Sequence, residues 1–365
     1  MKLIHCADIH LDSALTSNLD KDKARERNSE IMNTFLRMIR YAAGNDIKAI
    51  LISGDMFDKK KVSKKTAELV FDAIKNAPAV EFYYLKGNHD ALNFAENASA
   101  CPANLHLFNR TWTGYDLSSV TITGAEFDDA NAPILADGLS LDKDRVNIVM
   151  LHGTASESGL RSDGDTIAIK SYRNKGIDYM ALGHIHAVSE GRIDDRGVYA
   201  YPGCLEGRGF DELGDHGFIL LDIDESTKTV SRSFIPFAGR KLHNPRPDIS
   251  GARTVLDAEK IVEDELKKLA INSRDLVKIS LTGTVDADAD IQTELITKYF
   301  ENDYYFVKTK DETKTRIDYL AYANDASLKG EFVRTVQEDT ALSDEEAAEI
   351  VRCGMRVLAG EEVFD

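Results

Sequence analysis

Seven polar residues of types that bind divalent metal ions stand at the ends of apolar stretches of this chain. They are Asp8, His10, Asp55, Asn88, His152, His184 and His186. Imidazole nitrogens together with carboxylate and amide oxygens suit hard and borderline ions such as Mn²⁺, without any need for thiolates. Because seven ligands are too many for one ion, the set predicts two ions that share a bridging carboxylate, with Asp55 as the bridge.

Two metal ions held in this way can support in-line displacement at phosphorus. Neutral imidazoles fix the geometry without cancelling all the positive charge, and the remaining charge lowers the pKa of a bound water, so that hydroxide is available near neutral pH. The leaving oxygen then needs a proton. His89 is not required as a ligand and follows Asn88, so it is the predicted general acid. We expect Asp90 to hold the His89 ring in the required tautomer.

Each of these residues taken alone has a simpler explanation. A single histidine at a strand end is usually structural or solvated, and an aspartate after a glycine usually belongs to a turn or a cap. The prediction depends on five stretches that occur in one chain, each at the end of an apolar run. These stretches are Asp8-Ile9-His10, Gly54-Asp55, Gly87-Asn88-His89-Asp90, Leu151-His152-Gly153 and Gly183-His184-Ile185-His186.

The elements that must position these residues alternate between strands and helices in the first part of the chain. We expect strands over residues 2–7, 49–53 and 80–86 and helices over residues 22–43 and 63–76. This order implies right-handed crossovers and a parallel sheet. After about residue 103 short β runs dominate, with one helix expected near residues 166–175. An α/β half followed by a β-rich half predicts two sheets packed face to face, with helices outside.

Prolines 236, 245 and 247 indicate a linker, and the chain beyond it alternates again between helix and strand. We predict a catalytic domain over residues 1–240, a small α/β capping domain over 241–325 and a helical tail over 326–365. Ser343-Asp344-Glu345-Glu346 is a capping box that predicts the start of the last helix. Two apolar stripes lie in the tail, and they either pack on each other or accept a partner helix. They are Leu328, Phe332, Val333 and Val336, and Ile350, Val351, Val357 and Leu358.

The charge balance limits the classes of partner. The 365 residues include 45 Lys and Arg against 62 Asp and Glu, a net charge of −17. Such a chain is not a general binder of polyanions, so nucleic acid would require a local basic patch or metal ions. Lys59, Lys60, Lys61, Lys64 and Lys65 form either such a patch or a solvated helix start. Residues 154–165, which include Arg161, are expected to be a loop that either shapes substrate entry or is disordered.

Cysteine usage and hydropathy predict a cytoplasmic protein. The four cysteines are scattered and include no Cys-x-x-Cys pair, which argues against a zinc knuckle and favours free thiols in a reducing compartment. The sequence enters a strand pattern directly after Met1, so no signal peptide is expected. No apolar run is long enough to span a membrane.

The five stretches, in this order, resemble the calcineurin-like metallophosphoesterase family over roughly residues 1–237. The resemblance implies an α/β fold, a four-layer α/β/β/α sandwich, which agrees with the two packed sheets. It also implies a first metal ion bound by Asp8, His10, Asp55 and His186, and a second bound by Asp55, Asn88, His152 and His184. By the same resemblance His89 is the catalytic acid.

Within that family the chain is similar to the SbcD-type DNA repair exonucleases, including the bacterial YhaO-like branch. The residues that carry this similarity are Cys6-Ala7-Asp8-Ile9-His10-Leu11-Asp12, Gly54-Asp55-Met56-Phe57-Asp58, Tyr201-Pro202-Gly203-Cys204, Glu206-Gly207-Arg208-Gly209-Phe210 and Gly217-Phe218. The similarity implies a Mn²⁺-dependent exonuclease that acts on DNA with an SMC-like (SbcC-type) ATPase, whose coiled coil the helical tail would bind. A homodimer is left open.

Two residues depart from the pattern of that group. Asp58 stands where some members have a histidine that helps to orient the phosphate, and Cys204 stands where serine is common. A thiol is a weaker hydrogen-bond donor than a hydroxyl. The candidates for substrate contact are Asp58, Lys59, Lys60, Cys204 and Arg208.

Two other functions compete with DNA cleavage. The first is hydrolysis of a cyclic nucleotide or another small phosphodiester at the same site. A protein phosphatase is disfavoured because Lys59 replaces the arginine usual after the Gly-Asp-x-x-Asp motif. The second is a non-catalytic scaffold that binds DNA ends, against which His89 argues, because a scaffold has no use for a proton donor.

Overall fold

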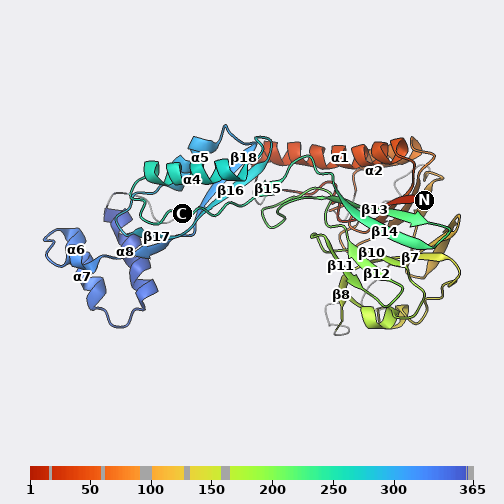
Figure 1. The fold of residues 1–365 in the computed structure, drawn as a ribbon. Helices are drawn as coiled ribbons and strands as arrows, with labels where there is room; N and C mark the ends of the chain where they lie inside the picture. The colour runs from red at the N-terminus through yellow and green to blue at the C-terminus, as the bar shows by residue number, and fades with distance from the viewer. Residues whose placement is uncertain are drawn as a thin grey trace. The chain divides into compact units, whose positions relative to one another are not determined.

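The computed structural model describes residues 1–15, 19–58, 62–90, 101–126, 132–157, 165–358 and 360. It divides into two compact units, Met1–Lys241 and Leu242–Asp365 (Figure 1). Lys59, Lys60 and the predicted loop residue Arg161 lie outside the described residues.

The first unit contains two six-stranded sheets. The first sheet has the order β14-β13-β1-β2-β3-β4. Its strands are β1 (Lys2–Cys6), β2 (Ile47–Ser53), β3 (Glu81–Leu85), β4 (Leu105–Leu107), β13 (Gly217–Asp224) and β14 (Thr229–Pro236). Strands β1 to β4 run parallel, as the strand–helix–strand order predicts, and β13 and β14 are antiparallel additions at one edge. The connecting helices are α1 (Lys21–Gly44) and α2 (Lys64–Lys75).

The second sheet has the order β11-β12-β10-β7-β6-β5. Its strands are β5 (Thr113–Leu117), β6 (Val120–Gly124), β7 (Val146–His152), β10 (Tyr179–Gly183), β11 (Ser189–Arg192) and β12 (Val198–Tyr201). Outside this sheet are the helical turn α3 (Ala132–Leu135), the strand pair β8 (Thr154–Ser156) and β9 (Thr166–Ala168), and the 3₁₀ turn η1 (Ile169–Tyr172). The predicted helix over 166–175 is therefore wrong: Thr166 and Ile167 pair with β8, as β-branched residues favour, and only one turn follows.

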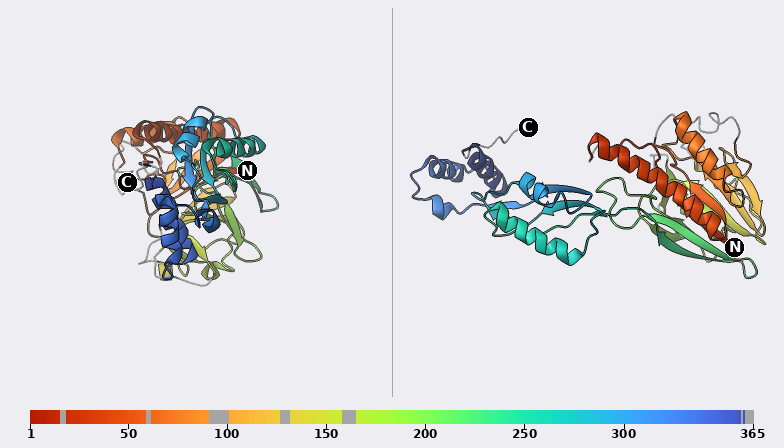
Figure 2. Two further views of the ribbon diagram at one scale, coloured as in Figure 1. Left: turned by 90° about the vertical axis from the view of Figure 1, so that its left-hand side faces the viewer. Right: turned by 90° about the horizontal axis from the view of Figure 1, so that it is seen from above.

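The two sheets pack face to face. One apolar cluster joins Leu3 and Leu51 of the first sheet to Ile148 and Tyr179 of the second. Helix α1 covers the outer face of the first sheet through a stripe at helical spacing that includes the fully buried Ile31 and whose other members are Phe35, Met38 and Ala42. Figure 2 shows α1 and α2 beside each other on this side (right view). The predicted fold class, an α/β/β/α sandwich, is confirmed for the first unit.

The second unit is a small α/β body followed by helices. Its elements are β15 (Leu242–His243), α4 (Val255–Leu269), β16 (Leu276–Leu281), β17 (Thr284–Asp286), α5 (Thr293–Phe300), β18 (Phe306–Asp311), β19 (Lys314–Arg316), α6 (Tyr319–Tyr322), α7 (Leu328–Glu338) and α8 (Asp344–Leu358). Helix α8 begins at the predicted capping box, where Ser343 and Glu346 exchange hydrogen bonds. Among the described residues, no helix is both long enough and apolar enough to cross a membrane.

The two apolar stripes of the helical hairpin are only partly buried. Val333, Val336 and Val351 pack in one cluster between α7 and α8. Leu328 and Val357 are 68% and 53% exposed. The buried residues of the two stripes therefore stabilise the hairpin, whereas Leu328 and Val357 are largely exposed to solvent. The separation of residues 241–325 as a capping domain from a docking tail stays a prediction.

A buried histidine between the sheets makes stability depend on pH. The His5 Nδ1 atom lies 2.8 Å from the Tyr179 hydroxyl, and burial lowers the pKa of His5 from 6.5 to about 3. Below pH 6.5 the unfolded chain takes up a proton that the buried ring does not, so the free energy of unfolding falls as the pH falls towards 3. Between pH 7 and pH 5 this loss is about 2 kcal/mol.

We therefore expect His5→Gln to reduce the fall in the free energy of unfolding between pH 7 and pH 5 by about 2 kcal/mol. Urea denaturation followed by the fluorescence of Trp112, the single tryptophan of the chain, measures this for the first unit. An equal pH dependence in the variant and the wild type would contradict the prediction. His106→Gln, at a ring that is partly exposed and paired with Glu81, is the control.

Candidate metal centre

The predicted ligands gather where the parallel strands of both sheets end. Asp8, Asp55 and Asn88 follow β1, β2 and β3, His152 is the last residue of β7, and His184 follows β10. The carboxyl ends of parallel strands form one edge of each sheet, which is the usual position of sites in open α/β sheets. The edges of the two sheets are tied together where the Ser53 hydroxyl donates to the Ala181 carbonyl at 3.1 Å.

The first group of side chains contains Asp8, His10, His186 and Asp55. The Nε2 atoms of His10 and His186 are 3.2 Å apart. His186 Nε2 lies 4.0 Å from Asp8 Oδ1, and His10 Nε2 lies 3.9 Å from Asp55 Oδ2. Asp8, His10 and Asp55 are almost completely buried. The structure therefore brings together the four residues predicted for the first ion, and three of them form a group able to hold a metal ion.

The second group shares Asp55. His152 Nε2 lies 3.3 Å from Asp55 Oδ2 and 3.0 Å from Asn88 Oδ1. The His184 ring stands 5.3 Å from the His152 ring, centroid to centroid. Asp55 thus lies within 4 Å of ring nitrogens in both groups, which is the position that the predicted bridge requires.

The hydrogen bonds and charges of these side chains favour bound cations. His152 Nδ1 donates to the Ser53 carbonyl at 2.9 Å, so Nε2 faces the oxygens of Asp55 and Asn88, and both contacts require a proton or a cation at Nε2. Burial raises the pKa of Asp8 to about 6, and the negative charge of the neighbouring Asp55 adds to this rise. The facing Nε2 atoms of His10 and His186 likewise repel each other unless a proton or a cation lies between them. Bound cations would relieve both conflicts.

The backbone at this edge adopts conformations that are uncommon for residues other than glycine. Asp8, His10, Asp55 and His184 all have positive φ angles, of 50°, 50°, 49° and 100°. Such conformations cost about 1–3 kcal/mol each and concentrate at functional sites. Gly87 is required by close approach, because a Cβ atom there would lie 2.2 Å from Asp55 Oδ1. The glycine of the motif therefore has a steric cause.

His89 lies at the rim of the two groups. Its side chain is 52% exposed, its backbone N–H donates to Asp55 Oδ1 at 2.9 Å, and its ring centroid is 5.3 Å from that of His10. Its Nδ1 atom lies 3.3 Å from Asp58 Oδ1. The predicted general acid is thus close to the cluster and accessible from solvent.

The role expected for Asp90 needs correction. Its carboxylate accepts hydrogen bonds at 2.8 Å from the backbone N–H groups of Phe57 and Gly87, so it joins the two turns that carry Asp55 and Asn88. The carboxylate beside the His89 ring belongs to Asp58 instead. Adjacent residues in a turn point in different directions, which is why proximity in sequence misled the prediction.

Of the candidates for substrate contact, Asp58 lies at the rim of the cluster and Cys204 is buried. Asp58 faces the rim, where it accepts from Ser13 Oγ at 2.8 Å and lies 3.7 Å from Arg208 Nη1. Its pKa is held far below the usual value mainly by the nearby His10 ring, whose Nδ1 atom lies 3.6 Å from Asp58 Oδ1. Cys204 is fully buried, with its sulfur 3.2 Å from His216 Nδ1, so it has no access to a substrate and this prediction is corrected.

Sequence reasoning missed Glu212 and Ser13. Glu212 is buried, and its Oε1 atom lies 2.6 Å from His186 Nδ1. It belongs to the loop between β12 and β13, 26 residues after His186, and matches none of the motifs. Only the path of the folded chain brings it to the site.

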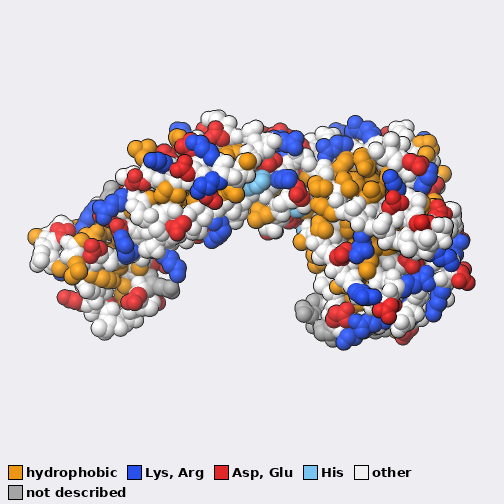
Figure 3. All heavy atoms as spheres, in the orientation of Figure 1, with side chains coloured by type: hydrophobic (Ala, Val, Ile, Leu, Met, Phe, Trp, Pro, Cys, Tyr) orange, Lys and Arg blue, Asp and Glu red, His pale blue; other side chains and the backbone are white. Residues whose placement is uncertain are grey.

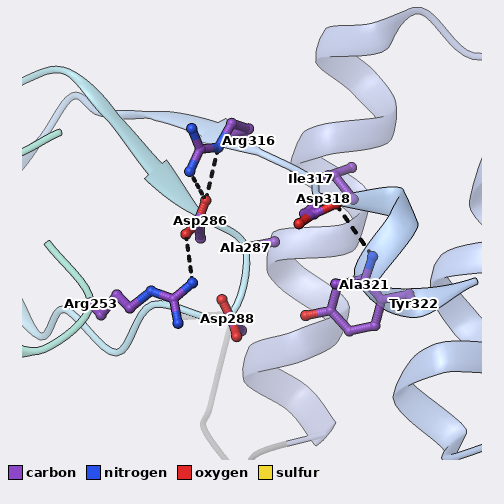
Figure 4. Close-up of a pocket in the computed structure, with 9 residues that line it drawn as sticks. All are labelled: Arg253, Asp286, Ala287, Asp288, Arg316, Ile317, Asp318, Ala321 and Tyr322. Carbon is purple, nitrogen blue, oxygen red and sulfur yellow. Dashed lines mark hydrogen bonds and ion pairs between the residues drawn. The ribbon is translucent and has the colours of Figure 1, made fainter. Parts of the chain in front are cut away.

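A pocket in the second unit holds arginines but offers little free positive charge. Arg253 and Arg316 both contact Asp286, at 3.2 and 2.6 Å (Figure 4). Asp288 and Asp318 also line this pocket. Its net charge does not favour a phosphate, so the strand-edge cluster of the first unit is the stronger candidate.

Comparison with known proteins agrees with this geometry. The model of the calcineurin-like phosphoesterase family matches residues 1–188. An uncharacterized metallophosphoesterase, YhaO of Bacillus subtilis, is 26% identical over 301 residues, which cover 78% of this chain and 72% of YhaO.

Relatives described as the DNA double-strand break repair protein Mre11 also match. That of Saccharolobus solfataricus is 23% identical over 372 residues, covering 95% of this chain and 92% of the relative. That of Methanopyrus kandleri is 25% identical over 255 residues, covering 61% of this chain and 54% of the relative. Since the family model spans more than half of the chain, the chain belongs to the calcineurin-like phosphoesterase family.

Proposed function

We propose that this protein is a two-metal phosphodiesterase that digests DNA as an exonuclease in DNA repair, with Mn²⁺ as the expected ion. The observation that carries the proposal is the meeting of two ligand groups at Asp55, with the exposed imidazole of His89 at their rim. Asp8, His10, Asp55 and His186 would hold one ion. Asp55, Asn88, His152 and His184 would hold the other.

The residues around the two ligand groups would have different roles in the reaction. The residues of the two groups would hold cations, which when bound would activate the attacking water and neutralise charge on the phosphate. In its protonated form His89 would donate Nδ1–H to Asp58 and Nε2–H to the leaving oxygen, and the 3.3 Å contact with Asp58 would orient the ring for this transfer. Arg208 and Asp58 stand on the same rim and would border the scissile phosphate.

Support for DNA as the substrate comes from the relatives and not from overall charge. Several matching relatives are described as DNA double-strand break repair proteins. On the face seen in Figure 3, acidic and basic side chains are interspersed over each unit. Contact with a DNA backbone would therefore depend on the bound cations and on local groups such as Arg208. The cytoplasm is the expected compartment.

We further propose that the helical tail binds an SMC-like ATPase. The outer half of its apolar stripes supports this, since Leu328 and Val357 are largely exposed while Val333 and Val351 are buried. Such exposed positions on an amphipathic hairpin are the usual anchors for a partner helix.

The test compares three substrates with the purified protein and Mn²⁺: end-labelled linear DNA, bis-p-nitrophenyl phosphate and cyclic nucleotides. Progressive shortening of the DNA that stops with EDTA would support the exonuclease. Hydrolysis of the small esters with intact DNA, both alone and with the ATPase partner, would favour a small-substrate phosphodiesterase. Binding of DNA ends without hydrolysis of any of the three would favour a scaffold.

A further inference from the structure

The loop between β12 and β13 places a carboxylate directly behind one of the candidate metal ligands. Glu212 is buried, and its Oε1 atom lies 2.6 Å from His186 Nδ1. Residues of the same loop hold both oxygens of the Glu212 carboxylate in place. Arg208 donates to Oε1 from Nη2 at 3.1 Å and to Oε2 from its backbone N–H at 2.7 Å, and the Cys204 thiol lies 3.5 Å from Oε2.

This contact determines which nitrogen of His186 carries the proton. A carboxylate accepts only, so the 2.6 Å contact requires a proton on Nδ1. Arg208 Nη2 also lies 3.2 Å from Nδ1, but a donor there does not replace the proton, because an unprotonated Nδ1 would face the Glu212 carboxylate at 2.6 Å with its lone pair. In the neutral ring Nε2 then bears the lone pair, and Nε2 is the atom that faces His10 and Asp8.

The two ligand groups are supported differently. His152 donates Nδ1–H to a backbone carbonyl, that of Ser53, whereas His186 donates to a carboxylate. A carboxylate behind an imidazole increases the basicity of the ligating nitrogen, and loss of such support commonly weakens metal binding by about 10–100-fold. A change at Glu212 should therefore affect only one of two sites.

We infer that Glu212 is a positioning residue that acts through His186 on the cation site of Asp8 and His10. This inference rests on the proposed function, because it assumes that His186 ligates a cation. Glu212 itself is buried, and it is connected to the rim only through Arg208, which contacts Glu212 through Nη2 and Asp58 through Nη1. Its effect is thus expected on metal affinity first, and on turnover only as a consequence.

The experiment is calorimetric titration of Mn²⁺ into the chelator-treated full-length protein. We expect two bound ions in the wild type. In Glu212→Ala one site should weaken by about 10–100-fold while the other keeps its affinity. Glu212→Gln retains an oxygen acceptor for Nδ1–H and should recover most of the loss. In a His186→Ala background, Glu212→Ala should add no further loss, because its effect passes through that ring.

A matched control comes from the same unit. Glu81 makes an equivalent contact with His106, at 2.7 Å, away from the candidate ligands, so Glu81→Ala should leave both Mn²⁺ affinities unchanged. Wild-type affinity at both sites in Glu212→Ala would overturn the inference alone. Failure of the wild type to bind Mn²⁺ would overturn the proposed function as well.

A second measurement does not depend on a variant that folds. With Zn²⁺ as a diamagnetic substitute, the ring ¹⁵N shifts of His186 in the wild-type protein report which nitrogen is protonated. A protonated Nδ1 supports the inference. A protonated Nε2 with Nδ1 bound to the ion would overturn it, even though the metal site itself would stand.

Discussion

Replacement of Asp55 with alanine is expected to release bound Mn²⁺ and to lower phosphodiester hydrolysis by roughly 10³-fold or more. Its Oδ2 atom lies 3.3 Å from His152 Nε2 and 3.9 Å from His10 Nε2, so one carboxylate takes part in both ligand groups. Its Oδ1 atom also accepts the backbone N–H of His89. The substitution therefore removes the shared negative charge and the anchor of the proton donor together.

Metal content after gel filtration, measured by elemental analysis, together with initial rates on DNA, tests this prediction. Asp55→Asn keeps an acceptor for the His89 backbone and removes only the charge, so it should lose metal to a similar extent. Asp195→Ala, at a fully exposed side chain, is the control. If Asp55→Ala retained two ions and wild-type turnover, the assignment of the whole centre would be wrong.

Substitution of His89 by glutamine is expected to lower DNA cleavage by about 10²–10⁴-fold while both Mn²⁺ ions stay bound. The ring is outside both ligand groups and half exposed, so its loss should leave the cations in place. The most informative measurement compares substrates whose leaving groups differ in their need for a proton. p-Nitrophenolate leaves without a proton, so hydrolysis of bis-p-nitrophenyl phosphate should fall much less than cleavage of DNA.

Asp58→Asn provides the companion variant. The carboxylate lies 3.3 Å from His89 Nδ1, and its loss should reduce DNA cleavage by about 10-fold with the same dependence on the leaving group. An equal loss on both substrates in His89→Gln, or a loss of Mn²⁺, would mean that His89 acts on binding and not as the acid.

The sequence predicted the frame of the site well because strand ends and apolar runs are local features. Continuous apolar stretches identified the buried strands, and the parallel order placed Asp8, Asp55 and Asn88 at one edge. The predictions that were wrong depend on the direction of side chains and on the path of the folded chain. Asp90 turns to the backbone of Phe57 and Gly87, while Asp58 takes the place beside His89.

The other errors have related causes. Glu212 reaches His186 through a loop that no periodicity describes. Cys204 is a predicted candidate for substrate contact, but the fold buries it completely, and the sequence of a loop does not show which of its side chains are buried. The sequence predicts a helix near residues 166–175, but the pairing of β9 with β8 determines the structure at the start of this segment.

The two ligand groups draw their side chains from both sheets. Asp8, His10, Asp55 and Asn88 follow strands of the first sheet, and His152, His184 and His186 belong to the second. Cations bound among them would therefore cross-link the two halves of the sandwich. At 100 times the dissociation constant, a ligand specific to the folded state adds about 2.7 kcal/mol per site to its stability. Metal supply would then govern how long the folded molecule survives against proteolysis, and not only how fast it works.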